Sequence, residues 1–220
     1  MPAMTETRLS PIGSRALLFE ARCPFDLEHQ QRFWALAEEA AQWPGVREAI
    51  PGMTNLMLLM DRVPIDIETL AHNLAILWRG GARKQVDGRL VEVDITYGGE
   101  GGLHLREVSE LTGLTVDQIV EIHSRTDYVV FAVGSHAGYC YLGGLDPRLE
   151  TPRRQNPLPR LPGGSLSIAG RQTGVSASSG PSGWNTIGST DFVFFDPSRA
   201  PASLLAPGDR IRFKPAGVIA

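Results

Sequence analysis

Four arginines lie close together in one proline-rich stretch of the chain, residues 146–162. They are Arg148, Arg153, Arg154 and Arg160. A guanidinium group binds carboxylates and phosphates through paired N–H donors, and proline restricts the backbone and so stiffens the loop. The stretch is therefore predicted to bind a small anion. The alternative is a solvated loop whose arginines pair with acidic groups on the protein's own surface.

One histidine, His123, stands at the expected end of a helix and directly before an expected strand. The helix dipole favours a protonated histidine at that end, so His123 is a candidate proton donor or anion ligand. The alternative is a capping histidine without a chemical role. No metal site is predicted in this chain, because the histidines at positions 29, 72 and 104 do not show metal-ligand spacing.

Neutral hydrogen-bonding and aromatic side chains follow the arginines. Gln172 can bind an amide or urea-like group, and Trp184 offers a flat apolar wall, although most tryptophans lie in a core. Together with the arginines they suggest a small polar anion as substrate. Ser135, beside His136, lacks the G-x-S-x-G setting of a hydrolase nucleophile. Further serines have no assigned base and are interpreted as an ordinary loop: Ser176, Ser178, Ser179 and Ser182.

The composition of the chain limits its partners. Its 220 residues carry 21 Lys and Arg against 24 Asp and Glu, a net charge of −3, and 42% are hydrophobic. Such a protein has no general attraction for nucleic acid or anionic lipid, so neither is expected as a partner. Cys23 and Cys140 lie far apart in the sequence, and neither a signal peptide nor a membrane-spanning run is recognised. A cytoplasmic protein with two free thiols is expected.

The elements of the first half alternate between strand-like and helix-like patterns. Two helices are expected after Asp26 and Asp66, which are good N-caps. The order β-α-β-β-α-β is that of ferredoxin-like split βαβ domains, in which two helices cover one face of an antiparallel sheet. Residues 1–98 are therefore predicted to form an N-terminal α+β domain. Its strands are expected at 14–21, 46–50, 54–60 and 89–97.

A glycine cluster, Gly98 to Gly102, is interpreted as a flexible joint, and the second domain is placed at 99–220. Two short helices follow, at 105–111 and 115–123. The second has two carboxylates and no Lys or Arg, which favours connector helices over a DNA-reading helix-turn-helix. Short strands with glycine and proline turns then predict an all-β barrel or sandwich. These strands are expected at 128–133, 165–169, 192–195 and 210–213.

An ordered series of motifs in the second half resembles one known family. The motifs are GYCYLGGLDPRL from Gly138 to Leu149, Pro152-Arg153-Arg154, Pro162-Gly163-Gly164-Ser165, Gln172-Thr173-Gly174, Gly183-Trp184, Phe195-Asp196-Pro197 and Pro207-Gly208-Asp209-Arg210. In this order they resemble the allophanate hydrolase subunit 1 family, and the resemblance extends over nearly the whole chain. It implies an N-terminal α+β domain followed by a C-terminal cyclophilin-like β-barrel.

The resemblance also implies a function that needs partners. The chain would be a non-autonomous subunit of an ATP-dependent 5-oxoprolinase-type amidohydrolase, acting on 5-oxoproline or a related small amide or lactam. Its partners would be a homologous C subunit, of the allophanate hydrolase subunit 2 type, and a third, ring-opening subunit. ATP would be shared with the partner, and Mg²⁺ would accompany it. Two alternatives stay open: a non-catalytic inhibitor of a sensor histidine kinase, and a subunit related to allophanate hydrolase or urea carboxylase.

The match carries particular site residues over to this chain. His123 is expected to assist proton transfer, and the substrate-binding residues would be Arg153, Arg154, Arg160, Gln172 and Trp184. The sequence departs from the family pattern in the loops around them. Ser135 stands for Phe, Ser176 for Tyr, Ser182 for Gly, Leu158 and Ser189 for Arg, and Ala137 and Ala177 for Pro. An aromatic wall and two cations are lost, which predicts a small-anion site with altered specificity.

Overall fold

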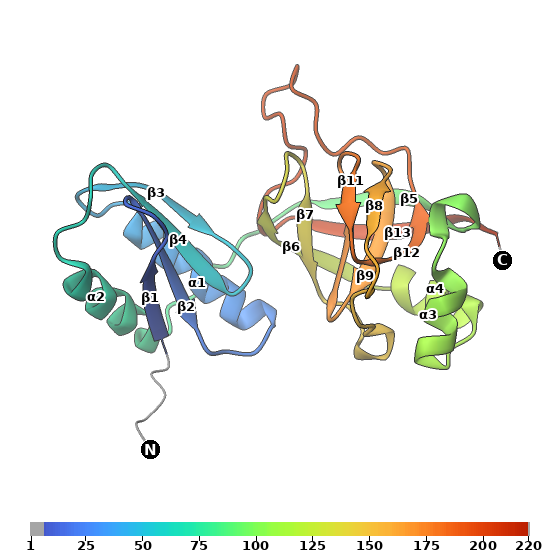
Figure 1. Cartoon of the computed structure of the whole chain (residues 1–220), viewed down its shortest axis with the longest axis horizontal. Helices are drawn as coiled ribbons and strands as arrows, with labels where there is room; N and C mark the ends of the chain where they lie inside the picture. Colours follow the sequence, from blue (N-terminus) through green and yellow to red (C-terminus); the bar gives the residue numbers. More distant parts are fainter. Residues whose placement is uncertain (1–6, 220) are drawn as a thin grey trace. The chain divides into compact units, whose positions relative to one another are not determined.

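A computed structural model describes residues 7–219 of the chain (Figure 1). The chain divides into two compact units, Met1–Gln85 and Val86–Ala220. Each unit has its own cluster of buried apolar side chains, as expected for two independently packed domains.

The N-terminal unit is an antiparallel sheet packed against two helices. Its elements are β1 (Thr7–Pro11), β2 (Ala16–Ala21), α1 (Leu27–Ala40), β3 (Val46–Pro51), β4 (Asn55–Met60) and α2 (Ile67–Gly80). The sheet order is β1-β2-β4-β3, with every pair antiparallel. Both predicted N-caps are confirmed: Asp26 accepts the backbone N–H of His29 at 2.9 Å, and Asp66 accepts that of Thr69 at 2.9 Å.

The core of this unit is built around three aromatic rings. Phe19 of β2, Phe33 of α1 and Trp78 of α2 are buried, with ring centroids 4.8 to 6.4 Å apart. Buried side chains alternate along β2 and β4 and recur at helical spacing along α1, so one sheet face meets the apolar faces of the helices. The predicted α+β fold is confirmed, and the elements from β2 to α2 follow the split βαβ order.

The last strand predicted for the N-terminal domain belongs to the C-terminal unit instead. Residues Leu90–Gly98 form β5, which joins the barrel of the C-terminal unit instead of the N-terminal sheet. The sheet edge beside β2 is filled by β1, which forms a hairpin with β2. The division between the units accordingly lies between Gln85 and Val86, and not after residue 98 as predicted. The reason is that β5 pairs along its whole length with β13 (Arg210–Ile219), a partner far away in the sequence.

The C-terminal unit contains a closed barrel of seven strands, in the order β10-β7-β6-β13-β5-β12-β9. β5 and β13 are parallel, and the other neighbouring pairs are antiparallel. The predicted cyclophilin-like barrel is confirmed.

The prediction of a strand at 192–195 is wrong. This segment is a loop, in which Phe192 and Phe194 pack on the barrel core. The remaining elements are β6 (Asp127–Val133), β7 (Cys140–Gly143), η2 (Pro147–Leu149), β8 (Leu158–Leu161), β9 (Ser165–Ala169), β10 (Gln172–Val175), β11 (Gly180–Ser182) and β12 (Asn185–Ser189).

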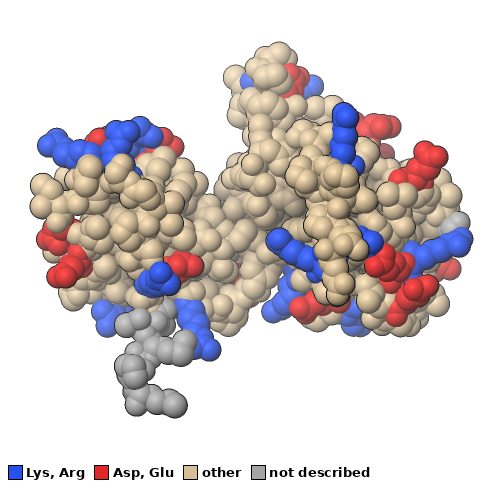
Figure 2. Space-filling model, viewed as in Figure 1, with Lys and Arg blue, Asp and Glu red and all other residues tan. Residues whose placement is uncertain are grey.

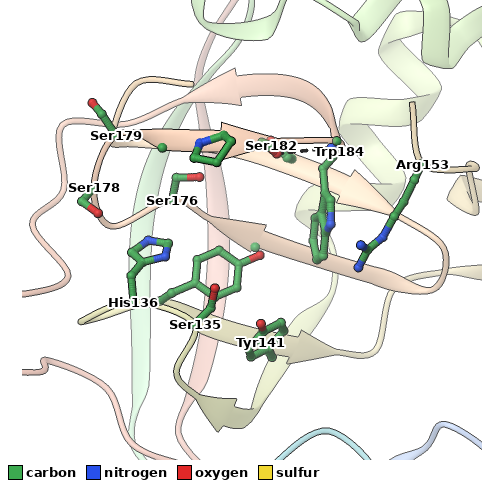
Figure 3. A pocket seen from close by; sticks show the side chains of 15 residues that line it. Ser135, His136, Tyr141, Arg153, Ser176, Ser178, Ser179, Ser182 and Trp184 are labelled. Atoms are coloured by element: carbon green, nitrogen blue, oxygen red, sulfur yellow. Dashed lines mark hydrogen bonds between the residues drawn. The ribbon is translucent and has the colours of Figure 1, made fainter. Parts of the chain in front are cut away.

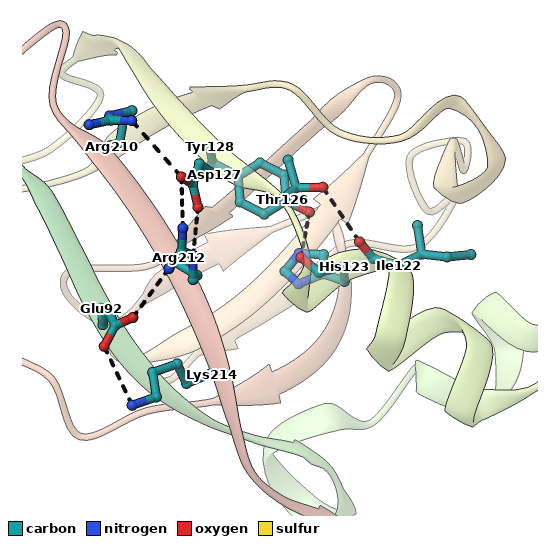
Figure 4. A network of polar contacts seen from close by, with 9 residues as sticks. All are labelled: Glu92, Ile122, His123, Thr126, Asp127, Tyr128, Arg210, Arg212 and Lys214. Carbon is teal, nitrogen blue, oxygen red and sulfur yellow. Dashed lines mark hydrogen bonds and ion pairs between the residues drawn. The ribbon is translucent and has the colours of Figure 1, made fainter.

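Ion pairs connect the neighbouring strands β5, β13 and β6 (Figure 4). Arg212 of β13 binds Asp127 of β6 at 2.7 and 3.0 Å, and Lys214 of β13 approaches Glu92 of β5 at 3.4 Å. These side chains are partly exposed, and an exposed ion pair contributes only about 0–1 kcal/mol. The pairs therefore add little to the stability of the barrel, and their main effect is to favour this register of the strands.

The glycine cluster predicted as a flexible joint packs closely on the barrel instead. Gly98 ends β5, and η1 (Gly99–Gly102) is a short 3₁₀ helix. Gly98 has a φ of +76°, and a Cβ there would lie 1.9 Å from the carbonyl oxygen of Ile219. A Cβ on Gly101 would lie 2.1 Å from the hydroxyl oxygen of Ser189. Glycine is needed at Gly98 because its φ is positive and the backbone of Ile219 approaches it closely.

Two short helices, α3 (Leu105–Thr112) and α4 (Val116–Ser124), pack on the barrel as the predicted connector helices. α4 begins with a capping box between Thr115 and Gln118. Val108 and Ile119 are fully buried and join the barrel core. Both helices therefore belong to the C-terminal unit.

Candidate functional site

One pocket of the C-terminal unit brings together polar and aromatic side chains (Figure 3). Its volume is ≈ 490 Å³, within the range of roughly 300–1,000 Å³ that is typical of small-molecule sites. It is formed by the β6–β7 hairpin, the loop before β8, strands β9 and β10, and the segment that follows β10. The lining side chains include Ser135, His136, Tyr139, Tyr141, Arg153, Ser167, Ser176, Ser178, Ser179, Ser182 and Trp184.

The β6–β7 hairpin is held in one conformation by its own backbone bonds. The N–H of Gly134 donates to the carbonyl of Tyr139 at 3.0 Å, and the N–H of Tyr139 donates to the carbonyl of His136 at 3.1 Å. Ser135 adopts a φ of +64°, a left-handed conformation that costs a residue with a Cβ about 1–2 kcal/mol. Strain of this kind is often found where a backbone is shaped for binding. In this hairpin it accompanies a His136 ring that points into the pocket (Figure 3).

Aromatic side chains form one wall of the pocket. Tyr139 meets Trp184 edge to face with centroids 6.4 Å apart, and it meets Tyr141 edge to face at 4.9 Å. The backbone N–H of Trp184 donates to the hydroxyl of Ser182 at 3.2 Å, which holds the tryptophan beside the pocket. Burial raises the pKa of Tyr139, so its hydroxyl stays protonated and neutral. Trp184 thus lies where its predicted role as a flat wall requires.

The loop that carries Arg153 is tied to its surroundings on both sides of that residue. Asn185 of β12 is 1% exposed, and its Nδ2 donates to the Thr151 hydroxyl at 3.1 Å and to the Pro152 carbonyl at 3.0 Å. The backbone N–H of Arg154 donates at 2.8 Å to a carbonyl of the segment before β12. These three bonds, called here the loop clamp, hold the backbone at Arg153 in place beside the pocket.

The four loop arginines have different surroundings. Arg148 pairs with the carboxylate two residues before it at 2.7 Å, and Arg154 pairs with Glu107 of α3. Arg153 lines the pocket, and no carboxylate of residues 7–219 pairs with it. Arg160 is exposed on β8, likewise unpaired within that range, and it does not line the pocket. Figure 2 shows acidic and basic side chains intermingled on the visible face of this unit.

His123, the predicted proton donor, does not line the pocket. It is fully buried in the barrel core, with its ring 5.1 Å from the rings of Tyr128 and Phe213. Its Nε2 lies 3.0 Å from the Thr173 hydroxyl, which itself donates to a backbone carbonyl, and its Nδ1 lies 2.8 Å from the Tyr97 hydroxyl. Burial lowers the pKa of His123 to about 3. The prediction of a protonated His123 is wrong, because desolvation outweighs the helix dipole.

Of the six predicted site residues, the pocket contains Arg153 and Trp184. Gln172 begins β10, where it pairs with Ala169 of β9, and it does not line the pocket. Tyr139 and Tyr141 line it without having been predicted. Their spacing of two residues, which places side chains on the same face of a strand, is a signal that could have identified them.

The two expected free thiols are confirmed, since Cys23 and Cys140 are unpaired. Within residues 7–219, His, Cys, Asp and Glu side chains do not gather in groups of three that could hold a metal ion. The helices in that range are too short or too polar to cross a membrane.

Comparison with known proteins shows the class to which this chain belongs. The family model described as carboxyltransferase domain, subdomain C and D, matches residues 7–205, and the chain belongs to this family. This confirms the resemblance found in the motifs. The chain is 40% identical to the B subunit of 5-oxoprolinase from Escherichia coli O157:H7 over 213 residues, 96% of this chain and 97% of the relative. It is 34% identical to the B subunit of 5-oxoprolinase from Bacillus subtilis (strain 168), over 80% of this chain and 78% of the relative.

Solved structures share the fold. TTHA0988 is 32% identical with a TM-score of 0.73, and the match covers 92% of this chain but only 40% of that one. The uncharacterized protein PH0987 from Pyrococcus horikoshii is 31% identical with a TM-score of 0.58, over 96% of this chain and 98% of that one. The urea amidolyase of K. lactis has a TM-score of 0.82 at 17% identity, over 99% of this chain and 15% of that one. At that identity the likeness concerns the fold alone.

Proposed function

We propose that this chain is a subunit of a 5-oxoprolinase-type complex and that its barrel pocket binds the small acidic amide on which the complex acts. The curated relatives are named as the B subunit of 5-oxoprolinase, which implies further subunits, and one of them is 40% identical over 96% of this chain. 5-Oxoproline combines a carboxylate with a small lactam ring. A guanidinium group and an aromatic wall are the protein groups that suit these two features.

The observation that carries the proposal is the unpaired guanidinium of Arg153 on the pocket wall, near Trp184 (Figure 3). Arg148 and Arg154 are already neutralised by carboxylates. Because Arg153 has no such partner in the described chain, its charge is available to an anion that enters the pocket. A hydrogen bond to a charged group contributes roughly 1.5–3 kcal/mol, which is enough to select for a carboxylate.

ATP with its Mg²⁺ does not fit this pocket. The lining side chains include one guanidinium, and they include neither lysine nor carboxylate. A nucleoside triphosphate site usually combines several phosphate-binding groups with oxygen ligands for Mg²⁺. We therefore propose that ATP binds mainly to a homologous C subunit, and that a third subunit opens the ring. The free thiols of Cys23 and Cys140 suit a reducing compartment, so the proposed location is the cytoplasm.

The test is activity of the assembled complex. The chain is co-expressed with a homologous C subunit and a ring-opening subunit, and ATP hydrolysis that depends on 5-oxoproline is measured. We expect turnover, and we expect Arg153→Ala to lower kcat/KM about 10- to 100-fold because a charge-assisted contact with the carboxylate is lost. Arg160→Ala is the matched control, since Arg160 is an exposed, unpaired arginine outside the pocket.

Three results would contradict the proposal. A well-formed complex without 5-oxoproline-dependent ATP hydrolysis would exclude the enzymatic function. Recovery of a sensor kinase in place of a homologous C subunit, in a pull-down from the native host, would favour a regulatory protein. Equal losses in Arg153→Ala and Arg160→Ala would show that the pocket is not the anion site.

A further inference from the structure

The pocket has two chemically different ends (Figure 3). Arg153 and Trp184 lie at one end, which offers a positive charge and an aromatic face. His136 and Ser178 lie at the other end, which offers groups that both donate and accept hydrogen bonds. A simple carboxylate would use only the first end, so the second end needs its own explanation.

His136 is the clearest sign that the second end binds a ligand. Its Nε2 is buried, and the ring makes no hydrogen bond with any residue in the range 7–219. The ring packs against Tyr139 at a centroid distance of 5.0 Å, and the His136 N–H donates to the Gly134 carbonyl at 2.8 Å, so both ring and backbone are held in place. A buried polar atom normally has a hydrogen-bond partner. A ligand or an ordered water would supply the one that His136 lacks.

The serines of the pocket divide into two groups. Three of them already bond within the protein: Ser167 with Thr186, Ser179 with the N–H of Gly163, and Ser182 with the N–H of Trp184. The hydroxyls of Ser135, Ser176 and Ser178 make no hydrogen bond within the described chain. These three lie toward the His136 end of the pocket (Figure 3). The groups without partners are therefore concentrated at that end.

We propose that His136, Ser135, Ser176 and Ser178 bind the amide group of a cyclic amide acid while Arg153 binds its carboxylate. This rests on the proposed function and adds the orientation of the substrate. An amide in a ring presents one N–H donor and one carbonyl acceptor, and an imidazole with three hydroxyls can satisfy both. A second carboxylate would suit this end less well, because neither arginine nor lysine lines it.

Three probes separate the two ends. 5-Oxoproline carries both the amide and the carboxylate, cyclopentanecarboxylate keeps the ring and the carboxylate without the amide, and 2-pyrrolidinone keeps the amide without the carboxylate. Their binding to the full chain is measured by chemical-shift titration at one pH. The proteins are the wild type, His136→Ala, Arg153→Ala and, as a control, His72→Ala, which changes an exposed histidine of α2.

The wild type and His72→Ala are expected to bind 5-oxoproline about three- to tenfold more tightly than cyclopentanecarboxylate, as one or two neutral hydrogen bonds allow. In His136→Ala this preference is expected to disappear while the affinity for cyclopentanecarboxylate stays the same. In Arg153→Ala the affinity for both carboxylates is expected to fall about tenfold or more, and that for 2-pyrrolidinone to stay unchanged.

The outcomes distinguish this inference from the function on which it rests. If His136→Ala keeps the preference for 5-oxoproline, the proposed orientation is overturned while the proposed function stands. If the wild type binds 5-oxoproline and cyclopentanecarboxylate equally well, the proposed orientation is likewise overturned; if it binds none of the probes, both proposals are contradicted. Should His136→Ala fail to fold, the double variant Ser176→Ala, Ser178→Ala provides the same test and is expected to lose part of the preference.

Discussion

His123 and His136 carry the same imidazole in opposite surroundings. Both ring nitrogens of His123 lie within hydrogen-bond distance of hydroxyls inside the barrel, those of Tyr97 and Thr173. The ring of His136 has no such partner in the described chain, and its Nε2 is buried beside a pocket. A satisfied buried histidine contributes to packing, whereas an unsatisfied one is available to a ligand. Residue type alone does not distinguish the two.

Acidification is expected to destabilise the protein through His123. Burial lowers the pKa of His123 to about 3, against 6.5 for an unperturbed histidine, so its contribution is complete above pH 6.5 and decreases as the pH falls toward 3. Burial lowers the pKa of His104 as well, which acts in the same direction. The free energy of unfolding, measured with urea, is expected to be about 2 kcal/mol lower at pH 5 than at pH 7.5.

The variant His123→Leu separates this effect from other acid-sensitive groups. It should be less stable than the wild type by about 1–3 kcal/mol at pH 7.5, because the hydroxyls of Tyr97 and Thr173 lose a partner, and this deficit should largely vanish at pH 5. Its difference between pH 5 and pH 7.5 should be clearly smaller. The carboxyl group of Asp146, whose pKa the hydrogen bonds from Arg148 lower to about 2, titrates below this window and does not interfere. An unchanged pH dependence in the variant would show that His123 is not the responsible group.

At the scale of elements, the loop clamp determines where Arg153 lies. Asn185→Ala removes the two hydrogen bonds that this side chain donates to Thr151 and Pro152, which directly precede Arg153. We expect binding of cyclopentanecarboxylate to weaken several-fold, since Arg153 is no longer held, while binding of 2-pyrrolidinone changes little. Chemical-shift titration measures both. Asn156→Ala is the control, because Asn156 is exposed in the same loop. Equal weakening of both probes would indicate general damage to the pocket.

Among the elements, those with local sequence signals could be predicted, whereas those that depend on distant partners could not. The helices that follow Asp26 and Asp66 were predictable, because their caps and apolar spacing lie within each segment. The sheet to which β5 belongs could not be predicted. Alternation of apolar and polar residues indicates a strand but not the strand with which it pairs, and residue 90 of β5 pairs with residue 210. Arg153 and Trp184 were recognisable as residue types. That Arg154 is neutralised by Glu107, 47 residues away in the sequence, became visible only in the fold.

At the scale of the whole molecule, the boundary between the units predicts which fragments fold. Residues 86–220 contain every barrel strand and are expected to fold alone, with cooperative urea unfolding and a β-rich circular dichroism spectrum. Residues 99–220 lack β5, so β12 and β13 would each lose a neighbour and the barrel would stay open. That fragment is expected to aggregate or to unfold without a clear transition. Equal stability of the two fragments would contradict this assignment of β5.

The position of β13 also affects how the protein is made. β13 lies between β5 and β6 in the barrel, yet it follows β5 by roughly 120 residues in the chain. A ribosome adds about 5–20 residues per second, so β5 and β6 wait on the order of 10 s for the strand that joins them. The N-terminal unit, whose strands all pair within 60 residues of the start, can fold during that interval. The unfinished barrel therefore exposes unpaired strand edges for this interval, which is when the nascent chain is most open to aggregation.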